Sequence, residues 1–174
     1  MRSASHIFSI LSIAPLGLLT MARTSPAVNQ DAIPTSGKER FAGSWRVTYF
    51  ETDGPPTQAL FTLGVDGTMV TAEHPVVTPP GAPSVIFTSS GHGEWTAVSP
   101  ESATFTFVGL GSDVQGQLWA VVTYRGGIIL DATGQTLSGE FVATIADPEG
   151  NTMATFPMRL NGSRIVAENS AVTT

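Results

Sequence analysis

The amino-acid sequence predicts an all-β fold, an antiparallel up-and-down β-barrel of roughly eight to ten strands. Short runs of alternating apolar and polar residues fill most of the chain beyond residue 40. Turn-forming dipeptides separate several of these runs, namely Asp66-Gly67, Thr133-Gly134, Glu149-Gly150 and Asn161-Gly162. Asp-Gly and Asn-Gly are typical of type I′ hairpin turns, in which both central residues have positive φ. A series of hairpins closes as a barrel because closure leaves no unpaired edge strand.

Each predicted strand rests on a pattern with a period of two residues. The first is the clearest, because Trp45, Val47 and Tyr49 fall on one face of the run 41–51. The strands that the pattern predicts lie at residues 41–51, 59–65, 68–73, 85–88, 91–98, 103–110, 117–131, 137–145, 152–160 and 164–167. The longest of them is expected to bulge or turn a barrel corner at Gly126-Gly127.

Residues 74–83 are expected to form a long loop instead of a strand. Prolines stand at positions 75, 79, 80 and 83, and proline cannot donate a hydrogen bond to a strand ladder. Long loops in compact domains often serve as lids or binding loops. We therefore expect this loop to lie at the mouth of the barrel.

The N-terminal segment has the pattern of a secretory signal peptide. Arg2 precedes an uncharged apolar stretch at residues 7–19, and small residues follow around positions 20–27. We assign residues 1–27 to the signal peptide, 28–40 to a flexible linker, 41–168 to the barrel domain and 169–174 to a loose tail. The expected location is therefore secreted or periplasmic.

Charge and cysteine content exclude several classes of partner and linkage. The chain has 14 acidic and eight basic residues, and two of the latter, Arg2 and Arg23, belong to the predicted signal peptide. The remaining chain is therefore strongly acidic, which disfavours nucleic acid and favours an uncharged or cationic ligand. The chain contains no Cys, so it forms no disulfide. Beyond the signal segment no apolar run approaches the ~20 residues of a membrane-spanning helix.

One motif at the start of the predicted barrel resembles a known family. The run Phe41-Ala42-Gly43-Ser44-Trp45 is similar to the Gly-x-Trp signature that opens the first strand of lipocalins and related calycin barrels. In that family the Trp closes one end of the barrel, and an Arg from the last strand lies over its ring. The resemblance implies a lipocalin-like fold in which Arg159 or Arg164 takes that position. It also implies binding of a small hydrophobic molecule.

The predicted ligand-binding residues are aromatic side chains on the apolar faces of their strands. They are Tyr49, Phe61, Trp95, Phe105, Phe107 and Phe141. Such side chains either line a cavity for a planar or apolar molecule or fill the core completely, and barrels of this size do both. Trp119 and Tyr124 have opposite parities, so at most one of them is expected to point inward.

No catalytic residue is predicted, and neither a metal site nor a cofactor is expected. The chain contains no Gly-x-Ser-x-Gly motif, and its single lysine, Lys38, lies in the predicted linker. His92 and Glu94 share a strand face, but Trp95 takes the opposite parity. We therefore expect both polar side chains to face solvent, where a third metal ligand is lacking.

The leading functional hypothesis is an exported barrel that binds a small hydrophobic ligand without catalysis. A first alternative is an isomerase or cyclase with a barrel like that of allene oxide cyclase, using Tyr49, Glu94 or Arg125. A second alternative is a cell-envelope interaction module with a filled core. A cavity in the barrel would argue against this second alternative. An ionisable group with a perturbed pKa inside that cavity would favour the enzyme.

Overall fold

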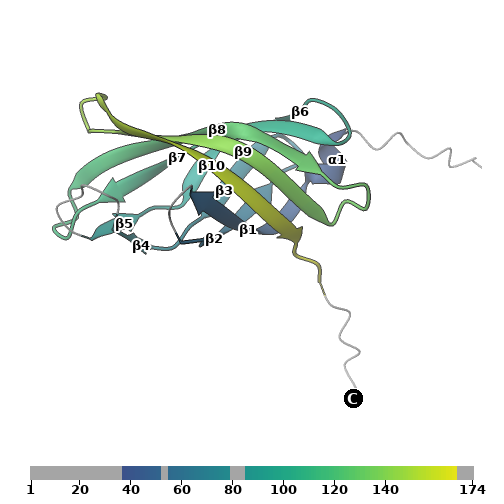
Figure 1. Cartoon of the computed structure of the whole chain (residues 1–174), viewed down its shortest axis with the longest axis horizontal. Helices are drawn as coiled ribbons and strands as arrows, with labels where there is room; N and C mark the ends of the chain where they lie inside the picture. The colour runs from purple at the N-terminus through teal and green to yellow at the C-terminus, as the bar shows by residue number, and fades with distance from the viewer. Residues whose placement is uncertain (1–36, 52–54, 79–84, 168–174) are drawn as a thin grey trace, which may run out of the picture. The chain divides into compact units, whose positions relative to one another are not determined.

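The computed structural model describes residues 37–51, 55–78 and 85–167, and these residues form an all-β domain (Figure 1). A short helix, α1 (Gly37–Phe41), precedes the strands. The strands are β1 (Gly43–Glu51), β2 (Thr57–Leu63), β3 (Thr68–Ala72), β4 (Val76–Val77), β5 (Ile86–Thr88), β6 (Gly91–Ala97), β7 (Ser102–Ser112), β8 (Leu118–Leu130), β9 (Thr136–Ala146) and β10 (Thr152–Arg164). The predicted signal peptide and C-terminal tail lie outside the described residues. Within the described chain, no helix is long and apolar enough to span a membrane.

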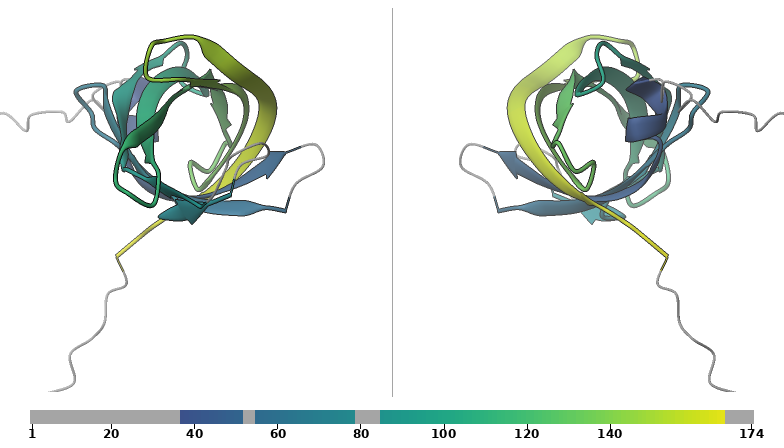
Figure 2. Two further views of the ribbon diagram at one scale, coloured as in Figure 1. Left: turned by 90° about the vertical axis from the view of Figure 1, so that its left-hand side faces the viewer. Right: turned by 90° about the vertical axis from the view of Figure 1, so that its right-hand side faces the viewer.

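The sheet closes on itself as an antiparallel barrel, which confirms the predicted fold class. Neighbouring strands pair in the order β7-β6-β3-β2-β1-β10-β9-β8, and a further pairing of β7 with β8 completes the ring. Figure 2 shows this ring along the barrel axis. Strands β4 and β5 pair with each other, and β5 pairs with the last residues of β7, beyond the stretch that β6 occupies. They therefore extend the wall at one end of the barrel.

Three of the four predicted hairpin turns are present, but the predicted turn type, I′, is wrong. Gly67 and Gly134 have positive φ values of 100° and 72°, but no described residue other than glycine does. Neither Asp66 nor Thr133 therefore has the positive φ that a type I′ turn requires. The Gly134 N–H donates to the Asp131 carbonyl over 3.1 Å, and the Asp131 carboxylate accepts the N–H of Gln135. The connection is therefore longer than the two-residue loop of a type I′ turn, and a glycine in the left-handed conformation stands near its end. The same arrangement recurs at Asp113–Gly116 and Asp147–Gly150.

The turn predicted at Asn161-Gly162 is absent, because both residues lie inside β10. They pair with Thr48 and Val47 of β1 on one side and with β9 on the other. A side chain at position 162 would meet the Leu137 side chain at 2.9 Å. Glycine therefore serves close packing here instead of a turn, and the predicted separate strand at 164–167 reduces to Arg164, the last residue of β10.

The predicted bulge at Gly126-Gly127 is also absent, since β8 pairs with both neighbours without a register shift there. A Cβ at Gly126 would lie 2.3 Å from the Phe141 Cβ, so this glycine allows β8 and β9 to approach closely. The register of β8 against β7 shifts instead between Gly111 and Ser112, which leaves Trp119 without a partner in the ladder. Bulges of this kind redirect side chains.

The end of the barrel near α1 is closed by a tightly packed cluster. The Trp45 side chain is fully buried and its indole N–H donates to the Phe41 carbonyl over 2.9 Å. Phe41 also packs on Trp95, with ring centroids 5.8 Å apart. The Arg164 guanidinium lies over the Trp45 ring, 4.2 Å from its centroid. Of the two arginines that the sequence suggested for this position, Arg164 therefore occupies it, while Arg159 forms an exposed ion pair with Glu140.

Candidate functional site

The six predicted ligand-binding residues are all buried, and together they fill the middle and the closed end of the barrel. The described core cluster contains Tyr49, Phe61, Trp95, Phe105, Phe107 and Phe141. Phe105 and Phe107 stack at a centroid distance of 5.9 Å, and Phe61 meets both by its edge. Trp95 lies at the closed end, where its indole N–H donates to the Gly64 carbonyl. None of the six is among the residues that line the internal cavity described next. Their role as ligand contacts stays a prediction.

The described side chains leave a space at the other end of the barrel, because the inward positions of β7 become glycines there. Along the inner face of β7, Phe105 and Phe107 are followed by Gly109 and Gly111. A Cβ at Gly109 would find no atom of a described residue within 4 Å, apart from its neighbours in the chain. The resulting cavity has a volume of about 710 Å³, within the range typical of small-molecule sites. The core is therefore filled in one half of the barrel and open in the other.

Apolar side chains form most of the cavity wall. They include Trp119, Ala120, Val122, Ala143, Phe156 and Met158. Trp119 lines the cavity although its parity is opposite to that of Tyr124, because it stands at the β8 bulge. The expectation that at most one of this pair points inward was therefore wrong.

The described part of the Pro-rich segment lies at the cavity, as predicted. Val77 and Thr78 line it. Contrary to the prediction of a continuous loop, Val76 and Val77 form β4. Val76 and Val77 can form a strand with β5 because Pro75 precedes them and Pro79 follows them, so neither proline lies within the strand. Residues 79–83 of the predicted loop lie outside the described residues.

A carboxylate and two tyrosine hydroxyls form a polar cluster at the cavity. The Tyr124 hydroxyl donates to Glu73 Oε2 over 3.1 Å, and the Tyr49 hydroxyl donates to Glu73 Oε1 over 3.4 Å. Glu73 and Tyr124 line the cavity, while Tyr49 is buried beneath it. Tyr124 also stacks on Phe107 at a centroid distance of 4.4 Å. The cluster is thus fixed on top of the aromatic core.

Burial changes the acidity of all three groups. It raises the pKa of Glu73, and the two tyrosine hydrogen bonds oppose this rise only in part. Burial and the neighbouring Glu73 raise the pKa of Tyr49 and of Tyr124 as well. Both hydroxyls therefore keep their protons at neutral pH and act as donors to the carboxylate.

The raised pKa of Glu73 predicts a specific dependence of stability on pH. The folded state holds this proton more tightly than the unfolded chain does. The resulting stabilisation is fully present below the unfolded pKa, near 4.5, and is lost as the pH rises through the folded pKa. Glu73→Gln cannot ionise, so its free energy of unfolding relative to wild type should increase from acidic to neutral pH, as measured by urea denaturation. Glu94→Gln replaces an exposed acid on β6 and is the matched control. A Glu73→Gln difference that changes with pH no more than the control difference does would contradict the assignment.

Sequence reasoning missed Glu73, although a signal for it was present. Met69 and Thr71 are buried on the inner face of β3, and Glu73 continues the same parity one step beyond the strand. An acid at an inward position is unusual, since buried carboxylates need partners. The two hydroxyls that satisfy it come from β1 and β8, so pairing them required the closed barrel.

The polar residues that the sequence suggested for chemistry lie elsewhere. His92 and Glu94 are exposed on the outer face of β6, as predicted, and Arg125 is exposed on β8. Of the three groups considered for an enzyme, only Tyr49 belongs to the cluster around Glu73. Among the described residues, no group of three His, Asp or Glu side chains is placed to hold a metal ion.

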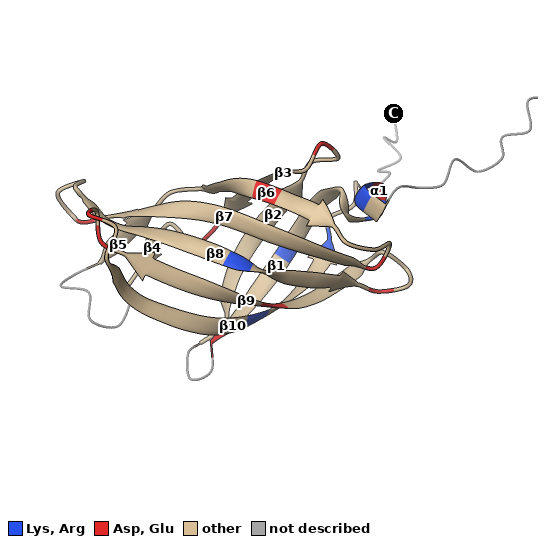
Figure 3. Ribbon diagram, turned by 90° about the horizontal axis from the view of Figure 1, so that it is seen from above, with Lys and Arg blue, Asp and Glu red and all other residues tan. Residues whose placement is uncertain are grey.

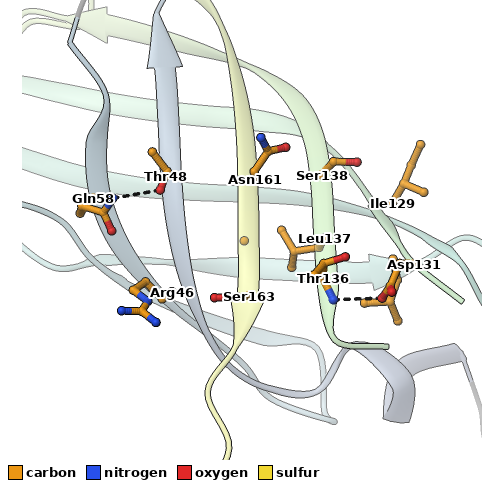
Figure 4. Close-up of a pocket in the computed structure, with 12 residues that line it drawn as sticks. Arg46, Thr48, Gln58, Ile129, Asp131, Thr136, Leu137, Ser138, Asn161 and Ser163 are labelled. Atoms are coloured by element: carbon orange, nitrogen blue, oxygen red, sulfur yellow. Dashed lines mark hydrogen bonds between the residues drawn. The ribbon is translucent and has the colours of Figure 1, made fainter. Parts of the chain in front are cut away.

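A second hollow of about 630 Å³ lies on the outer surface of β1, β9 and β10 (Figure 4). Its polar side chains include Arg46, Thr48, Gln58 and Asn161. The Gln58 amide donates to the Thr48 hydroxyl over 3.0 Å. Asp131 is the single acidic residue that lines this hollow within the described chain, and its carboxylate already accepts hydrogen bonds from Thr133 and Thr136 of its own turn. The internal cavity is therefore the stronger candidate site.

Charged residues are distributed differently on the outside and inside of the barrel. Figure 3 shows acidic residues at the hairpin turns and on β6 and β9, and basic residues on α1, β1, β8 and β10. Two acids, Glu51 and Glu73, line the cavity, whereas no described Lys, Arg or His does so. The cavity wall is therefore apolar with a negative or neutral polar part.

Comparison with known proteins identifies no family. No family model matches the chain, and no curated protein does. Among solved structures it is similar to the barrel EF1p2_mFAP2b bound to DFHBI, with 17% identity, a TM-score of 0.45, and coverage of 75% of this chain and 98% of that one. A redesigned barrel, mFAP1, bound to DFHBI, matches at 15% identity and a TM-score of 0.40, covering 74% and 98%. Similarity at this level concerns the barrel fold alone, which the strand pairings above establish independently.

Proposed function

We propose that the protein binds a small hydrophobic molecule in the cavity above its aromatic core. The observation that carries this proposal is the cavity itself, about 710 Å³ of space with a mostly apolar wall. Burying apolar ligand surface against such a wall contributes roughly 25 cal/mol for each Å² removed from water. Glu73 and Tyr124 supply the few polar atoms that orient a ligand in sites of this type.

The open space at Gly109 allows a direct test. Gly109→Leu fills part of the cavity without a clash at Cβ, and the backbone there has no positive φ. We expect it to weaken binding of the neutral fluorophore N-phenyl-1-naphthylamine at least about tenfold, measured by fluorescence titration. Gly127→Leu is the matched control, because the Cβ at this β8 position would meet only the Ala103 carbonyl, at 3.6 Å.

The control should bind the fluorophore like the wild type. Equal binding by wild type and Gly109→Leu would place the fluorophore outside the cavity. Absence of binding by the folded wild type would count against the proposed function as a whole. Thermal denaturation of each variant establishes that it is folded.

A second candidate function is proton transfer on an apolar substrate, as in an isomerase. The raised pKa of Glu73 inside the cavity favours it, since catalytic acids and bases often have perturbed pKa values. Glu73 would remove a proton from the carbon next to a carbonyl group and return it further along the same substrate, with no net gain or loss of atoms. Conversion of 3-cyclohexen-1-one to its conjugated isomer, lost in Glu73→Gln, would support this candidate, whereas binding without turnover supports the first.

We place the protein outside the cytoplasm and among lipocalin-like barrels as part of the same proposal. The apolar N-terminal segment supports export, and N-terminal sequencing of secreted protein should find a start between Ala22 and Gln30. The Gly43-Ser44-Trp45 motif with Arg164 over the Trp45 ring supports the likeness to lipocalins. The cavity argues against the alternative of an interaction module with a filled core.

A further inference from the structure

The charge of the cavity wall restricts the ligands that it accepts. Its two described charged residues are Glu51 and Glu73. The stretches 52–54 and 79–84, which the structure does not describe, contain no Lys, Arg or His in their sequences. A ligand carboxylate or phosphate would therefore meet like charge and no cation among the described residues of the wall. Juxtaposed like charges in a site of low polarity are strongly unfavourable.

Glu73 also has unused capacity to accept hydrogen bonds. Its two oxygens provide about four acceptor positions. The described hydrogen bonds fill two of them, one from Tyr49 and one from Tyr124. No other described side chain donates to this carboxylate. Since both tyrosines act as donors here, the free positions call for a further donor from the ligand.

A cation with N–H groups satisfies both conditions at once. Hydrogen bonds between ionised partners are roughly twice as strong as those between neutral ones. A carboxylate removed from water is costly when it is unpaired, so a matching positive charge stabilises it more than a neutral hydroxyl does. The apolar wall leaves room for the body of such a molecule beside Trp119, Ala143 and Phe156.

We propose that the ligand is a small apolar amine whose ammonium group binds Glu73 next to the Tyr49 and Tyr124 hydroxyls. This inference rests on the proposed binding function and adds the chemical class of the ligand. It assigns selectivity to Glu73 and affinity to the apolar wall. Amines are selected over alcohols with the same hydrocarbon body, and carboxylates are rejected.

Isothermal titration calorimetry at neutral pH with octylamine, octan-1-ol and octanoate tests this proposal, because the three probes share one alkyl tail. Octylamine should bind at least about tenfold more tightly than octan-1-ol, and octanoate should show no measurable binding. Glu73→Gln should remove the preference for the amine over the alcohol. Glu94→Gln, an exposed acid of the outer wall, should retain the preference and controls for general attraction to an acidic protein.

The possible outcomes separate this inference from the function on which it rests. Equal affinities for the amine and the alcohol would overturn the amine assignment and leave the binding function intact. A preference for the amine that survives in Glu73→Gln, or is lost in Glu94→Gln, would also overturn it. If none of the three probes binds the folded wild type, the binding function itself fails. The comparison of the three probes uses the wild-type protein alone, so it is valid even if a variant fails to fold.

Discussion

Trp45→Ala should lower the free energy of unfolding by about 3–5 kcal/mol, as expected when a large, fully buried aromatic side chain is truncated. The Trp45 ring has no exposed surface, and it lies between the core and the Arg164 guanidinium. Its loss would leave a cavity at the closed end of the barrel. It would also leave the Phe41 carbonyl without the indole N–H that donates to it. Urea denaturation monitored by far-UV circular dichroism measures the change.

Trp119→Ala provides the matched control for this prediction. Trp119 is half-buried at the opposite end of the barrel, where it lines the cavity. Because truncation there enlarges an existing space instead of creating a new one, its cost should be clearly smaller. A loss below about 1 kcal/mol for Trp45→Ala, small for a buried aromatic residue, would show that Trp45 does not close the barrel.

Arg164→Met should have the second largest effect, a loss of about 2–4 kcal/mol, because it removes a cation–π contact and several charge-assisted hydrogen bonds. Nε donates to the Gly134 carbonyl over 2.8 Å and Nη1 to the Ala42 carbonyl over 2.7 Å, while Nη2 donates to the Arg40 carbonyl. One side chain thereby joins the end of α1, the start of β1 and the turn between β8 and β9. Gly43 makes room for it, since a Cβ there would lie 2.8 Å from Nη1.

Arg159→Met is the control for Arg164→Met. Arg159 lies on the same strand, but its only described ion pair, with Glu140, is almost fully exposed. Pairs of this kind contribute at most about 1 kcal/mol. Equal losses of stability in the two variants, measured by the same denaturation assay, would contradict the special role of Arg164.

The alternation of residues predicted the barrel and its core well, because period two depends only on neighbours in the chain. Trp45, Phe61, Phe105, Phe107 and Phe141 are buried together, as their parities indicated. The contact between a late arginine and the first tryptophan was also expected from the Gly-x-Trp resemblance. The structure identified Arg164 because Asn161-Gly162 continues β10 instead of ending it.

The cavity and its polar cluster could not be predicted in the same way, because both depend on closure of the barrel. Gly109 leaves space only because small side chains of β8 and β9 face the same region. Glu73 is 24 residues from Tyr49 and 51 from Tyr124 in sequence. Local alternation contains no information on such distant partners. Alternation also predicted the side of the sheet on which Trp119 lies, but it assumed an unbroken strand, whereas β8 has a bulge at this residue.

Ligands should bind at the open end of the barrel. The three tryptophans of the chain allow this binding position to be tested in one measurement. A two-dimensional ¹H–¹⁵N NMR spectrum, recorded with and without N-phenyl-1-naphthylamine, reports their indole N–H groups separately. The signal of Trp119, which lines the cavity, should shift on binding. Those of Trp45 and Trp95, bonded to the Phe41 and Gly64 carbonyls at the closed end, should stay in place. Shifts at Trp45 or Trp95 with an unchanged Trp119 signal would contradict the account.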